Sequence, residues 1–235
     1  FKNGLWSVRA KNKEQSFALD LLMDPDVQVV SLVGKAGSGK TLLAIAAGLE
    51  QVMPNYSMDK LHNRMNGSKK TTGGDGLYKK LVVSRPVMPM GKDIGFLPGS
   101  MEDKMAPWLA PIQDNLKFLT GDDQTTLDDY MERGLIEMEA LTYIRGRSIA
   151  NAYIVIDEAQ NLTAHEIKTI LTRVGEGTKI VLTGDIEQID NVYINETSSG
   201  LVHAVEKFKG LDLSGHVTLR KGERSKVATM AAKYL

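Results

Sequence analysis

One stretch constrains the fold of this chain more than any other: Gly34-Lys35-Ala36-Gly37-Ser38-Gly39-Lys40-Thr41. It matches the phosphate-loop pattern G-x-x-x-x-G-K-[ST] at every fixed position. A β-branched run, residues 27–33, precedes it, and residues 42–52, rich in Ala and Leu and free of Pro, follow it. A strand, a glycine loop and a helix in this order direct backbone N–H groups and a helix N-terminus at an anion. The sequence therefore predicts a phosphate-binding site, and a glycine-rich turn without a ligand is the alternative.

The side chains and the backbone of this loop have distinct roles in the predicted site. Lys40 would reach the β- and γ-phosphates, and the Thr41 hydroxyl would be a ligand of Mg²⁺. The residues expected to contact the nucleotide are Gly34, Lys35, Ala36, Gly37, Ser38, Gly39, Lys40, Thr41 and Leu42. ATP and Mg²⁺ are therefore the expected cofactors.

The composition is that of an ordinary globular protein. Hydrophobic residues make up 42% of the 235 residues and charged residues 25%, unlike a disordered chain. Lys plus Arg and Asp plus Glu both number 29, so any nucleic-acid surface must be a local patch. The absence of cysteine excludes disulfides and thiolate metal sites. Since no apolar run is long enough to span a membrane and no signal-peptide pattern is present, we expect a cytoplasmic protein without membrane contact.

Alternating strands and helices predict the fold class. The expected strands are 27–33, 81–83, 136–142, 152–156, 179–183 and 217–219. The expected helices are 12–23, 42–52, 101–119, 122–133, 163–174, 200–207 and 225–235, with Pro107 and Pro111 kinking or dividing the third. This alternation predicts an α/β fold, a single domain with a mostly parallel, doubly wound sheet and helices on both faces.

Some stretches lie outside this alternation. Residues 1–10 are predicted to be a linker or an edge segment, and residues 11–235 the domain itself. The chain begins with Phe1 rather than Met, so we expect a fragment or a processed product. Residues 54–80 carry six basic and two acidic residues, which fits a solvated surface loop or a hairpin that touches nucleic acid. Residues 88–99, interrupted by Pro and Gly, are expected to be a loop.

Acidic side chains follow the most hydrophobic expected strand, residues 152–156. Ligands of open parallel sheets bind at the carboxyl ends of the strands. Asp157 is in the position of the aspartate that holds Mg²⁺ in phosphate-loop enzymes, and Glu158 is placed to polarise the attacking water. The alternative is a solvent-facing acidic pair at the end of a strand.

Two later segments add candidates. Gln188 follows the strand end Gly184-Asp185, and a neutral amide there could orient water or sense the γ-phosphate. Arg220 and Arg224 follow the last expected strand, and an arginine near the γ-phosphate would stabilise the transition state.

At this point several motifs, in a fixed order, resemble the PhoH-like ATPase family. They are Val83-Ser84-Arg85-Pro86, Gly95-Phe96-Leu97-Pro98-Gly99, Ile144-Arg145-Gly146-Arg147-Ser148 and Ile156-Asp157-Glu158-Ala159-Gln160-Asn161. The resemblance runs from about Asn12 to the C-terminus, except for residues 54–76. The chain resembles in particular the ATPase half of fused PIN–PhoH proteins, in which a PIN nuclease precedes this domain.

The family is similar to the RecA-like core of superfamily 1 helicases, which implies further roles. Gln15 resembles the glutamine that reads adenine. Residues 183–185 with Gln188 resemble the motif whose glutamine contacts the γ-phosphate, and Leu219 with Arg224 resembles the later motif with a phosphate-contacting arginine. Arg85 is placed where superfamily 1 proteins touch the nucleic-acid strand.

The resemblance also implies an assembly and an activity. One RecA-like domain supplies half of a helicase cleft, so a hexameric ring is implied. Arg145 or Arg147 would be offered to the neighbouring subunit, or would shape its own loop or contact RNA. The implied activity is Mg²⁺-dependent ATP hydrolysis coupled to movement along, or unwinding of, single-stranded RNA, with DNA possible. The alternatives are an ATP-gated oligomeric switch or scaffold, and a small-molecule phosphotransferase.

Overall fold

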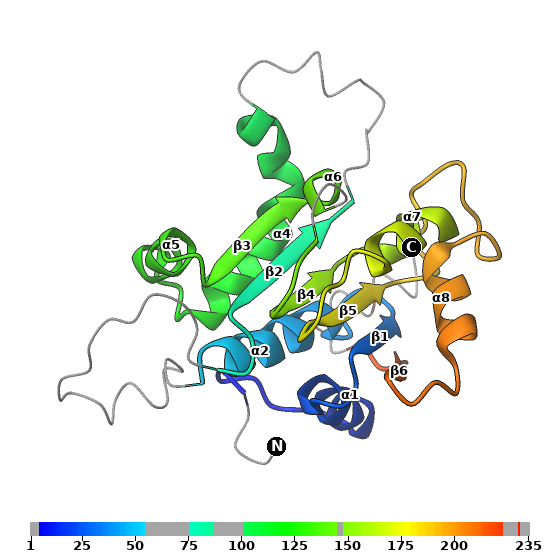
Figure 1. Ribbon diagram of the computed structural model, residues 1–235, viewed down its shortest axis with the longest axis horizontal. Coiled ribbons are helices and arrows are strands. Elements are labelled where there is room, and N and C mark those ends of the chain that lie inside the picture. The colour runs from blue at the N-terminus through cyan, green and yellow to red at the C-terminus, as the bar shows by residue number, and fades with distance from the viewer. Residues whose placement is uncertain (1–4, 55–75, 87–100, 145–147, 223–229, 231–235) are drawn as a thin grey trace.

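The computed structural model describes residues 5–54, 76–86, 101–144, 148–222 and 230, and it contains a six-stranded sheet (Figure 1). The strands are β1 (Val29–Gly34), β2 (Lys80–Arg85), β3 (Ile136–Ala140), β4 (Ala152–Ile156), β5 (Lys179–Gly184) and β6 (Ser214–Leu219). Their order is β3-β2-β4-β5-β1-β6, and all five pairings are parallel. The predicted parallel α/β fold is therefore confirmed.

Helices follow or precede each strand. They are α1 (Lys13–Met23), α2 (Lys40–Val52), α4 (Met101–Leu119), α5 (Gln124–Glu132), α6 (Leu141–Ile144), α7 (Ala164–Leu171) and α8 (Gly200–Phe208), with a 3₁₀ turn, η2 (Ala159–Asn161). The helix α2 contacts both α1 and α4, whereas α7, α8 and η2 pack together elsewhere. The helices thus form two separate layers, as a doubly wound sheet requires.

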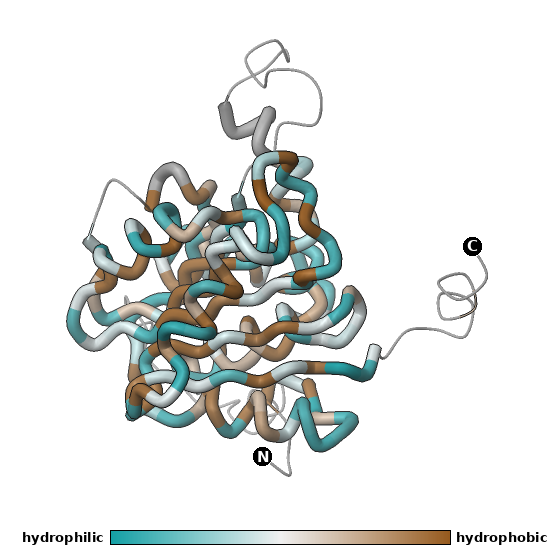
Figure 2. The backbone as a smooth tube through the Cα atoms, turned by 90° about the vertical axis from the view of Figure 1, so that its right-hand side faces the viewer, coloured by the Kyte–Doolittle hydropathy of each residue, from teal (hydrophilic) through white to brown (hydrophobic). Residues whose placement is uncertain are grey.

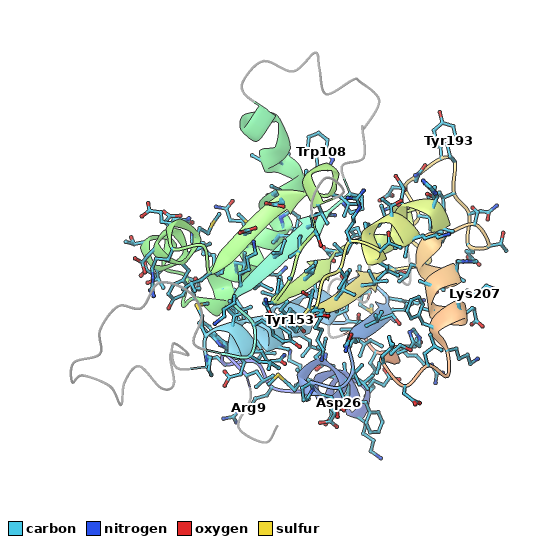
Figure 3. All side chains as sticks on the ribbon, viewed as in Figure 1. Arg9, Asp26, Trp108, Tyr153, Tyr193 and Lys207 are labelled. Carbon is cyan, nitrogen blue, oxygen red and sulfur yellow. The ribbon has the colours of Figure 1, made fainter. Side chains whose placement is uncertain are left out.

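Side chains along each strand point alternately to the two faces of the sheet, so the hydrophobic core is divided into two clusters, one on each face. Tyr153 and Val155 of β4 belong to the cluster formed with α1, α2 and α4. Ile154 and Ile156 belong to the cluster formed with α7 and α8. Successive side chains of a strand point to opposite faces, so a strand buried on both faces must be continuously apolar. Figure 2 shows hydrophobic stretches of the backbone in the middle of the molecule, and Figure 3 places Tyr153 there as well.

Local signals explain where the helices α1 and α7 begin. Asn12 caps α1, with Oδ1 accepting from the N–H of Gln15 at 2.9 Å. Thr163 and Glu166 form a reciprocal capping box at the start of α7, which confirms the sequence prediction. Each cap satisfies N–H groups that a helix N-terminus leaves without a partner.

The structure corrects some predicted boundaries. The helix α4 includes both Pro107 and Pro111 and is continuous, so of the two predicted effects, a kink or a division, the division does not occur. Ile112 and Leu116 of the same helix are fully buried, and their packing offsets the backbone bonds that proline removes. The short helix α6 was not predicted, and the predicted loop 88–99 and helix 225–235 lie outside the described residues, apart from residue 230.

The first described residues belong to the core. A short antiparallel bridge joins Leu5 to Val8. Trp6 is 3% exposed, and its ring forms a T-shaped contact with the ring of Tyr130 of α5, with the centroids 6.4 Å apart. The segment expected to be a linker or an edge therefore packs on the domain from residue 5 onward.

None of the helices in the described part of the chain combines the length and the hydropathy that a membrane span needs.

Candidate nucleotide-binding site

The phosphate loop lies between the end of β1 and the start of α2. Gly37 and Gly39 have φ values of 80° and 85°, a left-handed conformation that favours glycine. A Cβ on Gly34 would lie 2.6 Å from the carbonyl oxygen of Leu219, so the close pairing of β1 with β6 also requires glycine. The helix α2 begins at Lys40, so its free N–H groups and the positive end of its dipole face the loop.

The Lys40 ammonium lies against the loop to which it belongs. Its Nζ donates to the carbonyl of Lys35 at 3.4 Å, and only 8% of the residue is exposed. Lys35 itself extends into solvent, where its Nζ lies 3.0 Å from the carboxylate of Glu187. Since the bond from Lys40 is long, a phosphate oxygen can replace the carbonyl as its acceptor.

Asp157 receives hydroxyl groups from two other elements. Its Oδ1 accepts from Thr41 Oγ1 at 2.8 Å and from Thr183 Oγ1 at 2.7 Å. Thr41 belongs to α2 and Thr183 to β5, while Asp157 follows β4 and is 4% exposed. The structure thus brings the two predicted Mg²⁺ ligands, Thr41 and Asp157, into direct contact.

Glu158 has a left-handed backbone, with φ of 54°, in the turn after β4. Its Oε1 lies 3.4 Å from Nη2 of Arg85, at the end of β2. Its Oε2 accepts a hydrogen bond from Nε2 of Gln160. Positive φ is unusual for a residue with a side chain, and its surroundings must hold it there. The predicted water-activating carboxylate and the predicted nucleic-acid contact are therefore direct neighbours.

Gln160 is a site residue whose role the sequence prediction missed. It is fully buried, and besides Glu158 its Nε2 donates to the carbonyl of Gln188 at 3.0 Å. Its Oε1 accepts from the N–H of Asp185 at 3.2 Å. One carboxamide therefore joins the Glu158 turn to the loop after β5. The available signal was an amide, able to donate and accept at once, two residues after a strand-end acidic pair.

The loop after β5 also contacts the phosphate loop. Asp185 Oδ2 accepts from the N–H of Ala36 at 2.9 Å, and Oδ1 accepts from the N–H of Glu187 at 3.0 Å. Asp185 is buried, whereas the Gln188 side chain is exposed and its backbone carbonyl is held by Gln160. The structure places Gln188 in the loop that borders the site, with its side chain directed to solvent.

Gln15 joins α1 to the phosphate loop. Its Nε2 donates to the carbonyl of Ser38 at 3.0 Å, and its Oε1 accepts from the N–H of Lys11 at 2.8 Å. It is 4% exposed and lies against Gly39, where a Cβ would come within 3.1 Å of Nε2. The Nε2 group has a second hydrogen to donate and Oε1 a second lone pair to accept with, so the amide can also form hydrogen bonds to an adenine.

The remaining predicted residues are either outside the described part of the chain or lie at positions that the structure gives. Arg145, Arg147 and Arg224 lie outside the described residues. Arg220 follows β6, is exposed, and donates its backbone N–H to the carboxylate of Glu14 at 2.7 Å. Leu42 lies half-buried in the first turn of α2.

The sequence matches a known family over most of its length. The profile of the family described as "PhoH-like protein" matches residues 7–61 and 72–233. Protein PhoH2 of Bacillus subtilis (strain 168) is 52% identical over 233 residues, which are 98% of this chain and 48% of that protein. Protein PhoH2 of Mycolicibacterium smegmatis is 38% identical, with 98% and 48% covered. The chain spans about half the length of the curated relatives it matches.

Solved structures show a more distant likeness. Pif1 helicase from Bacteroides bound to single-stranded DNA aligns with a TM-score of 0.40 and 13% identity over 95% of this chain and 45% of that chain. The large terminase of a thermophilic bacteriophage aligns with a TM-score of 0.46 and 11% identity over 96% of this chain and 50% of that chain. Both TM-scores lie below 0.5, so neither likeness bears on what this chain does.

Proposed function

This chain belongs to the PhoH-like protein family, its phosphate loop and parallel sheet are those of a P-loop ATPase, and we propose that it hydrolyses ATP with the help of Mg²⁺. One observation carries the proposal. Thr41 Oγ1 lies 2.8 Å from Asp157 Oδ1, so the helix that follows the phosphate loop and the acidic strand end of β4 meet at one point. Lys40 and Glu158 directly adjoin these two residues in the sequence, so a cation and a carboxylate are available close to that point.

Binding of the phosphates is assigned to the loop and to the start of α2. The N–H groups of residues 34–42 and the helix dipole would hold the β- and γ-phosphates, and Lys40 would exchange the Lys35 carbonyl for a phosphate oxygen. Gln15 would contact the adenine from its place beside Ser38.

The donor set at this point fits Mg²⁺. Thr41 supplies a hydroxyl and Asp157 a carboxylate, and Mg²⁺ prefers one or two such oxygens together with water and phosphate. The described residues contain no cluster of three or more His, Cys, Asp and Glu side chains that would hold a metal by itself. When bound, Mg²⁺ supplies charge neutralisation at the β- and γ-phosphates.

Glu158 is assigned to the water. Its carboxylate would accept a proton as the water oxygen bonds to the γ-phosphorus and ADP leaves. Lys40 and an arginine, Arg224 of the same chain or Arg145 or Arg147 of a neighbour, would balance the charge of the transition state. A carboxylate beside the predicted metal ligand favours attack by water over transfer to a small acceptor, and this separates the proposal from a phosphotransferase.

We further propose that hydrolysis is coupled to movement along, or unwinding of, single-stranded RNA by a hexameric ring, with DNA as a second possible strand. The support is the single RecA-like domain, which supplies half of a cleft, and the position of Arg85 at the carboxyl end of β2. We also propose that a PIN nuclease domain accompanies this domain; the PhoH2 relatives, about twice as long as this chain, have room for a further domain. Gln188 would report loss of the γ-phosphate to the strand-binding loops.

The test separates binding from turnover. Glu158→Gln should bind a fluorescent ATP analogue as the wild type does and hydrolyse ATP about 100-fold to 10,000-fold more slowly, the usual contribution of a general base. Lys40→Ala should lose binding. Equal turnover by Glu158→Gln and the wild type would contradict the assignment.

Two further measurements on the same samples test the alternative functions, a phosphotransferase and an ATP-gated switch. Transfer of labelled phosphate to small acceptors would favour the phosphotransferase. An oligomer that forms with ATP in light scattering, together with slow hydrolysis that RNA does not change, would favour the switch.

A further inference from the structure

We propose that Arg85 restrains Glu158, and that a phosphate group of single-stranded RNA frees Glu158 by taking Arg85 as its own partner. The inference rests on the proposed function, because it assigns Glu158 to the attacking water and a nucleic-acid strand to Arg85. It adds the step that joins the two events: strand binding would switch on hydrolysis by exchanging one ion pair for another.

Both carboxylate oxygens of Glu158 are engaged. Oε1 lies 3.4 Å from the Arg85 guanidinium, and Oε2 accepts from the Gln160 amide. A carboxylate acts on water through an oxygen within hydrogen-bond reach of that water. Arg85 therefore competes with the water for Oε1, while Gln160 fixes the other oxygen and so the orientation of the group.

The backbone sets this pairing. The strands β2 and β4 are parallel neighbours, with Ser84 opposite Ile156, and the N–H of Asp157 donates to the Ser84 carbonyl at 2.8 Å. Arg85 and Glu158 are thus the side chains that leave two adjacent strand ends. The left-handed backbone of Glu158, with φ of 54°, directs its side chain out of the line of β4.

The ion pair is accessible enough to be exchanged. The Arg85 side chain is 22% exposed and that of Glu158 is 26% exposed. Removing a partner from a fully buried pair leaves an uncompensated charge, whereas a partly exposed pair contributes little and is screened by water. Because a guanidinium binds the oxygens of a phosphate in a bidentate manner, RNA offers Arg85 a stronger acceptor than one carboxylate oxygen at 3.4 Å.

The same strand supplies a matched control. Lys80, at the start of β2, forms an ion pair with Glu137 of β3 at 2.7 Å, and the side chains are 26% and 25% exposed. The pair has nearly the same exposure as the Arg85–Glu158 pair but lies at the opposite end of β2 from the site. A variant of Lys80 therefore reports the effect of removing an ion pair from β2 without touching Glu158.

The experiment measures steady-state ATPase rates with and without oligouridine for the wild type, Arg85→Gln and Lys80→Gln. Without oligouridine, Arg85→Gln should hydrolyse ATP about twofold to fivefold faster than the wild type, since a partly exposed ion pair shifts an equilibrium by at most about that factor. Oligouridine should then stimulate Arg85→Gln little, while KM for ATP stays unchanged. Lys80→Gln should match the wild type in both conditions.

The outcomes separate the inference from the function on which it rests. If the role of Arg85 were merely structural, Arg85→Gln would hydrolyse ATP more slowly than the wild type. An ATPase rate of Arg85→Gln without RNA that equals or lies below that of the wild type therefore overturns the inference, while the proposed ATP hydrolysis still holds. If Arg85→Gln is poorly folded by circular dichroism, Arg85→Lys replaces it and should show a smaller rise of the same sign. A wild type that does not hydrolyse ATP refutes the proposed function itself, and the inference with it.

Discussion

Lys179 allows a quantitative test of how the fold supports the site. It begins β5, is fully buried, and its Nζ donates to the carbonyls of Leu21, Leu22 and Asp24 at 3.0, 2.8 and 2.7 Å. These carbonyls end α1, the helix that carries Gln15 to the phosphate loop. Burial lowers the pKa of Lys179 from 10.5 to about 8, partly opposed by the negative charge of Asp24.

The sign of the effect follows from the two pKa values. Between pH 8 and 10.5 the unfolded chain keeps the Lys179 proton while the folded chain loses it, so the free energy of unfolding rises with pH. The gain between pH 8 and 10 is about 2 kcal/mol. Above pH 10 the trend reverses, because burial raises the pKa of Tyr78 to about 12 and that of Tyr153 well above 10.

Urea unfolding followed by circular dichroism at several pH values from 8 to 10 measures this gain. Lys179→Met is the control, because it keeps an unbranched side chain of similar length but has no proton to lose. Between pH 8 and 10 the free energy of unfolding should rise by about 2 kcal/mol more in the wild type than in Lys179→Met, because the two tyrosines affect both proteins alike. The same pH dependence in the two proteins would refute the argument.

Two further substitutions test the site and the loop. Gln160→Ala removes the amide that fixes Glu158, so kcat should fall about tenfold to 100-fold with little change in ATP affinity. An unchanged kcat in steady-state assays would show that Glu158 needs no such support. Gly34→Ala would bring a Cβ within 2.6 Å of the Leu219 carbonyl oxygen, so the free energy of unfolding measured in urea should fall by about 1–3 kcal/mol. A variant as stable as the wild type would mean that β1 and β6 can separate without cost.

The four inner strands, β1, β2, β4 and β5, were predictable because each contains a short buried apolar run in a chain with clear turns. The capping box at Thr163 and Glu166 marked the start of α7. Boundaries were less predictable where packing decides: β6 begins at Ser214, three residues before the predicted strand, because pairing with β1 extends it. The helix α4 remains continuous despite Pro107 and Pro111, because tertiary packing outweighs the local preference.

The site was predictable at the level of which strand ends converge. The phosphate-loop pattern and the Asp157-Glu158 pair sufficed for that, because carboxyl ends of parallel strands meet at one edge of the sheet. The contacts between side chains were not predictable. Sequence spacing does not reveal that Gln160 spans two loops or that Arg85 faces Glu158, because both depend on strand order and on a left-handed turn.

The most direct test of the central claim is the steady-state ATPase rate of the wild-type chain with and without oligouridine, beside Glu158→Gln. We expect wild-type hydrolysis that oligouridine accelerates, and a variant that binds ATP but hydrolyses it at least about 100-fold more slowly in either condition. A slow wild-type rate that oligouridine leaves unchanged would contradict RNA-coupled hydrolysis, and equal rates for the two proteins would contradict the role of Glu158.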